Sequence, residues 1–197
     1  KRQGVTIMRM VEAMDAGPIL HRIREPVLPE ETTSELTIRL SELGAEALVE
    51  ALTLLAAGEV EEEEQDHEMA TFAPKVDRSS ARIDWTQGAS AIARLVRGMD
   101  AVPGAWSELA GVPVKFFRPR EAEAESPTGR RGNGAPSPAK AAPDPGTVVA
   151  ADGESGVVIA TGVGPLAFDE VQPPGKRRML AVDWIRGRGV SVGQRFE

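Results

Sequence analysis

The sequence has no cysteine, only two histidines and no long apolar run, and each shortage excludes a class of function. Without cysteine the chain forms neither disulfide bonds nor thiolate metal sites, which fits a reducing compartment. His21 and His67 are too few and too far apart in the sequence to predict a metal centre or a Ser-His-Asp triad. The apolar runs fall far short of the roughly 20 residues of a transmembrane helix. We therefore expect a soluble, cytoplasmic protein with no metal and no membrane partner.

The chain also lacks an initiating methionine and enters an apolar segment within four residues of Lys1. Residues 5–11 carry five large apolar side chains, a pattern that predicts a strand buried on both faces of a parallel sheet. Such a strand needs neighbours that the rest of the sequence does not supply. We therefore expect the chain to be a fragment that contains the end of a larger α/β domain.

Asp15 lies in the turn Asp15-Ala16-Gly17-Pro18, which follows this apolar segment. In open parallel sheets, ligands bind at the carboxyl ends of the strands, so Asp15 is a candidate catalytic residue. An Asp in this position can equally serve only to hydrogen-bond the backbone of its own turn. The spacing alone does not decide between the two.

The clearest helix signal follows Thr32. Thr32 and Glu35 have the spacing of a capping box, apolar residues then recur every three or four positions, and Gly58 ends the pattern as a C-cap. The next residues are strongly acidic, and we interpret 59–75 as a solvated linker because like charges repel. The sequence thus predicts a first domain over residues 1–58.

Residues 76–197 are predicted to form a small all-β domain, a barrel of the oligonucleotide-binding type with two short helices, because about five short strands alternate with turns. Trp85 stands among apolar neighbours, which favours a core anchor over a base-stacking platform, and Asp84 beside it is expected to be a cap or turn residue. Residues 121–145 consist mainly of Ala, Pro, Gly, Ser and charged residues. We expect this segment to be a disordered insert.

Charge is distributed unevenly along the chain. Residues 1–70 contain 6 Lys and Arg against 16 Asp and Glu, whereas residues 71–197 contain 17 against 14. Basic clusters in the second part can bind a phosphate backbone, with little dependence on sequence, or can simply be solvated. The candidate RNA-binding residues are Lys75, Arg78, Arg82, Lys115, Arg118, Lys176, Arg177 and Arg178.

Several motifs resemble the folate-dependent formyltransferases. The segment from Gly4 to Leu20, with GVTIM followed by MDAGPIL, resembles a signature of the superfamily as a whole. FAPK at 72–75, ARIDW at 81–85 and PGAW at 103–106 resemble the methionyl-tRNA formyltransferases in particular. The resemblance implies the end of a Rossmann-like formyltransferase domain, followed by a carboxy-terminal domain that binds tRNA.

The resemblance also implies a reaction, the transfer of a formyl group from 10-formyltetrahydrofolate to the amino group of initiator methionyl-tRNA, by an enzyme that is monomeric when complete. It assigns catalysis to an Asn, a His and an Asp, of which the Asp corresponds to Asp15. It places Met14, Asp15, Ala16 and Gly17 at the folate site. The upstream Asn-x-His segment is absent from this sequence, so we expect the isolated chain to be inactive.

Two alternatives remain open on the sequence. One is another member of the superfamily, a sugar-nucleotide formyltransferase or a formyltetrahydrofolate hydrolase, although a hydrolase has no need of a tRNA-binding tail. The other is an RNA-binding module without catalysis, which requires that the second part of the chain bind tRNA with strong salt dependence whether or not Asp15 is mutated.

Overall fold

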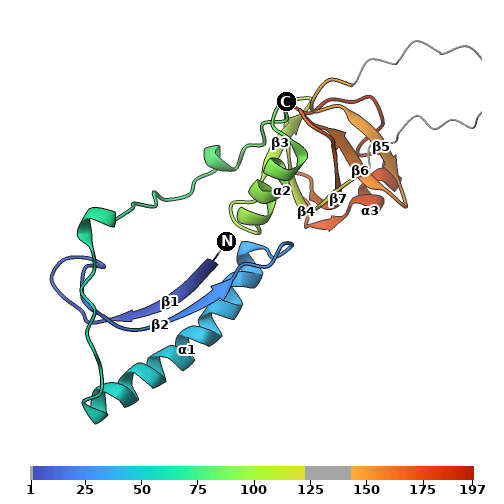
Figure 1. The fold of residues 1–197 in the computed structure, drawn as a ribbon. Coiled ribbons are helices and arrows are strands. Elements are labelled where there is room, and N and C mark those ends of the chain that lie inside the picture. Colours follow the sequence, from blue (N-terminus) through green and yellow to red (C-terminus); the bar gives the residue numbers. More distant parts are fainter. Residues whose placement is uncertain (1, 123–142) are drawn as a thin grey trace, which may run out of the picture. The chain divides into compact units, whose positions relative to one another are not determined.

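The computed structural model describes residues 2–122 and 143–197, and the chain divides into two compact units, Lys1–Lys75 and Val76–Glu197 (Figure 1). Most of the insert expected at 121–145 lies outside the described residues. Within the described part of the chain, no helix is both long enough and apolar enough to cross a membrane.

The first unit contains an antiparallel pair of strands and one long helix. Strand β1 (Arg2–Met8) pairs with β2 (Ile19–Pro26), and helix α1 (Thr33–Ala57) packs along this pair (Figure 1). A short 3-10 helix, η1 (His67–Met69), follows the acidic stretch.

The prediction of a parallel strand buried on both faces is wrong for the structure described. Strand β1 ends at Met8, and the next apolar residues, Met10 and Val11, are 86% and 44% exposed. Among the described residues, β1 pairs only with β2, because the loop between them reverses the chain and brings its nearest sequence neighbour alongside. An apolar run predicts that a segment is buried, but it does not specify whether the partner strand is parallel or antiparallel.

Both ends of α1 form as the sequence predicts. The backbone N–H of Glu35 donates to Oγ1 of Thr32 over 3.3 Å, and the backbone N–H of Thr32 donates to Oε2 of Glu35 over 2.9 Å. At the other end Gly58 adopts φ +71°, in the left-handed region where glycine is favoured as a cap. The capping box and the C-cap are confirmed.

Arg39 of α1 links the helix to the residues that precede it. Its guanidinium donates to both carboxylate oxygens of Glu31, over 2.9 and 2.8 Å, and to Glu25 of β2 over 3.0 Å. The Glu31 side chain is only 5% exposed. The hydrogen bonds from Arg39 hold the pKa of Glu31 below its ordinary value of 4.5.

This pairing predicts acid sensitivity in the first unit. Because the pKa of Glu31 is lower in the folded state, its stabilising contribution is complete above the unfolded pKa and is lost as the pH falls through the folded value. We expect Glu31→Gln to lower the melting temperature at pH 7 and to flatten its decline below about pH 5. Thermal unfolding followed over a pH series tests this, with Glu42→Gln on the exposed side of α1 as the control. Parallel pH profiles for the two variants would contradict the expectation.

In its described residues, the second unit is a curled antiparallel sheet accompanied by the α-helices α2 and α3. Five of its strands run in the order β3-β4-β7-β6-β5, and β8 pairs with β7. The short 3-10 helix η2 (Ser79–Ala81) precedes them. The elements are α2 (Ala89–Gly98), β3 (Trp106–Leu109), β4 (Val112–Glu121), β5 (Val148–Asp152), β6 (Gly156–Ala160), β7 (Pro165–Gln172), β8 (Met179–Leu180) and α3 (Ala181–Arg186).

Residues 193–197 bridge the two edges of this sheet. Arg195 pairs with Thr147, which precedes edge strand β5, and Phe196 pairs with Leu109 of the opposite edge strand β3. The segment therefore satisfies backbone groups at both edges at once. This explains why the sheet is curled rather than open.

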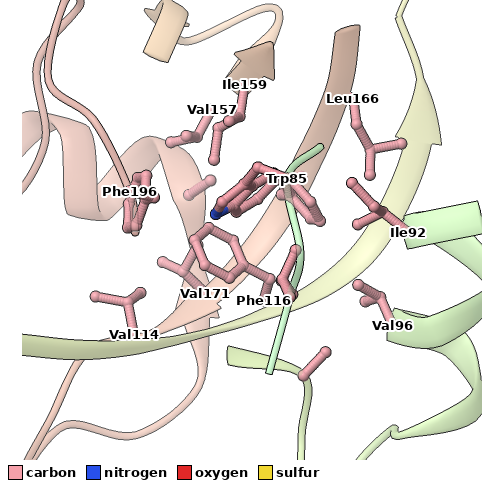
Figure 2. Close-up of a cluster of buried hydrophobic side chains, with 14 of the residues drawn as sticks. Trp85, Ile92, Val96, Val114, Phe116, Val157, Ile159, Leu166, Val171 and Phe196 are labelled. Carbon is pink, nitrogen blue, oxygen red and sulfur yellow. The ribbon is translucent and has the colours of Figure 1, made fainter. Parts of the chain in front are cut away.

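Trp85 stands at the centre of the core of the second unit (Figure 2). Its ring centroid lies 5.6 Å from Phe116, 6.0 Å from Phe168 and 6.1 Å from Phe196. The indole N–H donates to Oγ of buried Ser107 over 2.9 Å. The prediction that Trp85 anchors a core is confirmed.

Asp84 has the turn role that the sequence predicts. Its Oδ1 accepts hydrogen bonds from the hydroxyl of Thr86 over 2.6 Å and from the backbone N–H of Thr86 over 3.0 Å. The bond from the Thr86 hydroxyl is the largest cause of the lowered pKa of Asp84. A carboxylate held in its own turn in this way has a local structural role.

Candidate functional site

The loop that carries Asp15 connects β1 to β2 and is closed at its neck. The backbone N–H of Arg9 donates to the carbonyl of Pro18 over 2.9 Å. Gly17 is buried against this neck, and a Cβ atom on it would lie 1.8 Å from the Arg9 carbonyl oxygen. Asp15 itself is exposed, with φ +56°, a left-handed conformation that Asp adopts more readily than most residues. The loop thus presents a carboxylate to solvent from a constrained backbone.

The four residues predicted to contact folate are consecutive and run from the exposed part of this loop into its neck. Met14 is 89% exposed, Ala16 is half-buried and Gly17 is buried. An exposed thioether beside an exposed carboxylate offers one apolar and one charged contact to a ligand.

The acidic residues after α1 are exposed, as the sequence predicts, but part of the stretch is also anchored to the same loop, which the sequence does not predict. Glu63 and Ile19 exchange two backbone hydrogen bonds of 2.8 and 3.0 Å. Arg9 donates to the carboxylate of Glu62 over 3.1 Å, and Arg22 lies 2.7 Å from that of Glu63. These arginines offset the repulsion among the acids, and Ile19 offers backbone groups that the segment can pair with.

Gln65 is a candidate functional residue that the sequence interpretation missed. Its Nε2 donates to the carbonyl oxygens of Asp15 over 2.9 Å and of Gly17 over 2.6 Å. The only signal in the sequence is that Gln65 is the one amide in the acidic run 59–68. That signal does not say which backbone the amide contacts.

Three of the basic candidates gather around Trp106. The guanidinium carbons of Arg78 and Arg82 lie 4.7 and 5.3 Å from the Trp106 ring centroid, and the indole N–H donates to the Arg78 carbonyl over 2.7 Å. Lys115 of β4 stands opposite Trp106 in the β3–β4 register. Trp106 itself is only 9% exposed, so its ring supports the arginines and is not open to solvent.

A second group of basic candidates follows β7. The backbone N–H of Lys176 donates to the carbonyl of Pro173 over 3.1 Å, which forms a tight turn, and both Lys176 and Arg177 are exposed. These two positively charged side chains are accessible to an anion in solution.

Arg178 belongs to the same basic run but has a different environment. Its Nη1 donates to Asp100 over 3.1 Å, its Nε donates to Glu170, and its guanidinium lies 4.0 Å from the Phe117 ring centroid. The Asp100 side chain is 6% exposed. Arg178 is thus already paired with two carboxylates, which favours a structural role.

The remaining two candidates are Lys75 and Arg118. Lys75 is exposed and ends the first unit. Arg118 of β4 is exposed and has φ +49°. In the described parts of the chain, no three His, Asp or Glu residues gather in an arrangement that could hold a metal ion.

Comparison with protein families places both units in one group. Residues 75–189 match the sequence model described as the C-terminal domain of formyl transferase, and residues 1–52 match the model described as formyl transferase.

Two curated relatives match nearly the whole chain. The methionyl-tRNA formyltransferase of Aromatoleum aromaticum is 39% identical over 194 residues, which are 98% of this chain and 56% of the relative. That of Thiobacillus denitrificans is 40% identical over 196 residues, 98% of this chain and 57% of the relative. The chain therefore spans just over half the length of these relatives.

Solved structures share the fold at low sequence identity. HypX from Aquifex aeolicus has a TM-score of 0.69 at 22% identity, over 97% of this chain and 32% of HypX. The same protein in complex with tetrahydrofolic acid has a TM-score of 0.66, over 93% of this chain and 30% of HypX. WlaRD, a sugar 3N-formyl transferase, has a TM-score of 0.57 at 14% identity, over 89% of this chain and 56% of WlaRD.

Proposed function

Because the chain belongs to the formyl transferase family, we propose that it is part of a methionyl-tRNA formyltransferase. In this proposal the complete protein transfers the formyl group of 10-formyltetrahydrofolate to the amino group of initiator methionyl-tRNA, and acts as a cytoplasmic monomer. The observation that carries the proposal is the 39% and 40% identity to relatives of that name, extending over both units. The sugar formyltransferase neighbour is much more distant, and its likeness concerns the fold alone.

The proposal gives each part of the chain a task. Residues 1–58 are the end of the catalytic domain, residues 59–75 connect it to the next domain, and residues 76–197 are a barrel of the oligonucleotide-binding type that holds tRNA. The curled sheet whose edges are bridged by residues 193–197 supports the barrel.

Asp15 is the proposed catalytic carboxylate. The reaction needs a neutral amine as nucleophile, stabilisation of a tetrahedral oxyanion, and a proton for the departing folate nitrogen. A carboxylate beside an imidazole favours the charged imidazolium and orients it, and this is the role proposed for Asp15. Met14, Ala16 and Gly17 would line the folate beside it. No Asn-x-His segment occurs in this chain, so its own residues supply only one part of the catalytic group.

An activity assay tests the proposal. The full-length protein that contains this chain is expected to form formyl-methionyl-tRNA from 10-formyltetrahydrofolate and methionyl-tRNA, and the 197-residue chain alone is expected to form none. Absence of product with the full-length protein would contradict the proposal. Salt-dependent tRNA binding without formyl transfer would favour the RNA-binding module. Turnover by the isolated chain near that of the full-length protein would contradict the placement of catalytic residues outside it.

The exposed basic residues of the second unit are the proposed tRNA contacts, and Lys176 and Arg177 are an adjacent exposed pair among them. We expect Lys176→Ala with Arg177→Ala to weaken tRNA binding and to reduce the slope of log K against log salt by about 1 to 2. Fluorescence anisotropy with labelled tRNA across about 50 to 200 mM salt measures both quantities.

Arg186→Ala is the matched control for this pair. Arg186 is exposed and basic, and it lies outside the predicted set in helix α3. Because the control removes one charge and the pair removes two, a change of slope half as large in the control would show that net charge alone governs binding. Arg82, Arg78 and Lys115 around Trp106 form the next set to vary, followed by Lys75 and Arg118. Arg178 is expected to affect folding through its two carboxylate partners.

A further inference from the structure

The amide of Gln65 reaches two backbone oxygens on either side of Ala16. Nε2 lies 2.9 Å from the Asp15 carbonyl oxygen and 2.6 Å from the Gly17 carbonyl oxygen. A side-chain amide nitrogen carries two hydrogens, so one donor group serves both carbonyls. Asp15 has a left-handed backbone conformation in this arrangement, in which both carbonyl oxygens accept from the same nitrogen.

The loop has a second constraint at its neck, and this constraint does not reach the tip. The Arg9–Pro18 hydrogen bond joins the two ends of the loop, whereas Met10 and Met14 are 86% and 89% exposed. Exposed loop residues with few buried contacts move readily. The hydrogen bond from Gln65 to the Asp15 carbonyl therefore extends the restraint beyond the neck, to the residue that carries the carboxylate.

Gln65 is itself held in place by the segment that contains it. Glu63, two residues earlier, exchanges two backbone hydrogen bonds with Ile19, and Glu62 pairs with Arg9 at the loop neck. These contacts attach the segment to both ends of the loop.

We propose that Gln65 is a positioning residue for formyl transfer, which holds the backbone of Asp15 and Gly17 so that the Asp15 carboxylate keeps one orientation toward the reacting groups. This inference rests on the proposed function. Gln65 does not touch the substrates in this proposal, and it acts through the loop. A misplacement of about 1 Å in a reacting group costs up to about 100-fold in rate, so such restraint has a measurable effect.

Two substitutions test whether Gln65 acts by donating hydrogen bonds or only by the volume of its side chain. Glu at position 65 keeps the size of the side chain but would place an acceptor-only carboxylate against two carbonyl oxygens. Lys has three donor hydrogens and comparable reach. If hydrogen-bond donation to the loop is the function, Gln65→Lys retains activity that Gln65→Glu loses. Glu64→Gln, an exposed neighbour in the same acidic run, is the matched control.

The experiment uses the full-length protein and two readouts. Steady-state kinetics with both substrates are expected to show kcat reduced about tenfold or more in Gln65→Glu, with KM values within about threefold. Gln65→Lys and Glu64→Gln are expected to stay within about threefold of the parent in kcat. Hydrogen exchange of the peptide covering residues 9–20 is expected to be faster in Gln65→Glu only.

Several results would overturn the inference. These are an unchanged kcat in Gln65→Glu, equal losses in the Glu and Lys variants, or an effect confined to KM or to the melting temperature. If the parent full-length protein forms no formyl-methionyl-tRNA, the proposed function fails. The hydrogen-exchange measurement then tests only whether Gln65 restrains the Asp15 loop. Unchanged exchange would then show that Gln65 does not restrain the loop, and faster exchange in Gln65→Glu would show that it does, without a role in formyl transfer.

Discussion

Replacing Asp15 by Asn in the full-length protein is expected to lower kcat for formyl transfer by about 1,000-fold, while tRNA affinity changes little. Asn preserves the shape of the side chain but carries no negative charge. It therefore cannot stabilise an imidazolium in the way proposed for Asp15. Because the Asp15 side chain is exposed, the substitution should leave the melting temperature nearly unchanged. Single-turnover formylation and tRNA anisotropy measure the two expected effects separately.

The control for Asp15 lies on the same loop. Glu12 is also exposed and acidic, and Glu12→Gln removes one negative charge from nearly the same region. An equally large loss in Glu12→Gln would indicate a general effect of loop charge. A loss of less than about tenfold in Asp15→Asn would contradict the catalytic role.

Replacing Trp85 by Ala is expected to destabilise the second unit by about 3 to 5 kcal/mol. The side chain is 4% exposed, and its ring meets three phenylalanine rings, so removing it leaves a large cavity (Figure 2). The substitution also removes the partner of Ser107 Oγ, which is fully buried and itself donates to the Glu197 carbonyl over 2.6 Å. Denaturant unfolding followed by far-UV circular dichroism gives the free energy of unfolding.

A second substitution separates packing from hydrogen bonding at this position. Trp85→Phe keeps an aromatic ring in the core and loses the indole donor. We expect it to cost about 1 to 3 kcal/mol, less than Trp85→Ala. If Trp85→Ala cost less than about 1 kcal/mol, the residue could not be the centre of the core.

Features whose partners lie close in the chain could be predicted from sequence. The capping box of Thr32 and Glu35 spans three residues, and the bonds of Asp84 reach only to Thr86 and Gln87. The burial of Trp85 was predictable because its side chain is a large, mostly apolar ring system. The family followed from short motifs that the sequence displays directly.

Features that depend on distant partners could not be predicted in this way. Lys176, Arg177 and Arg178 are consecutive basic residues, yet only the fold shows that Arg178 meets Asp100, which is 78 positions away. The sequence of the acidic stretch shows only repulsion, whereas the fold supplies Arg9 of the β1–β2 loop and Arg22 of β2 as partners.

The sequence by itself determined the membership of the chain in the formyl transferase family, the ends of its long helix and the aromatic centre of its second unit. Only the tertiary structure decided that β1 pairs antiparallel with β2, that Gln65 contacts the Asp15 loop and that Arg178 forms ion pairs with Asp100 and Glu170. The physical reason is the range of the interactions. Caps, turns and apolar clusters are encoded within a few residues, whereas the partner of a strand, an amide or a charge depends on which distant segments the fold brings together.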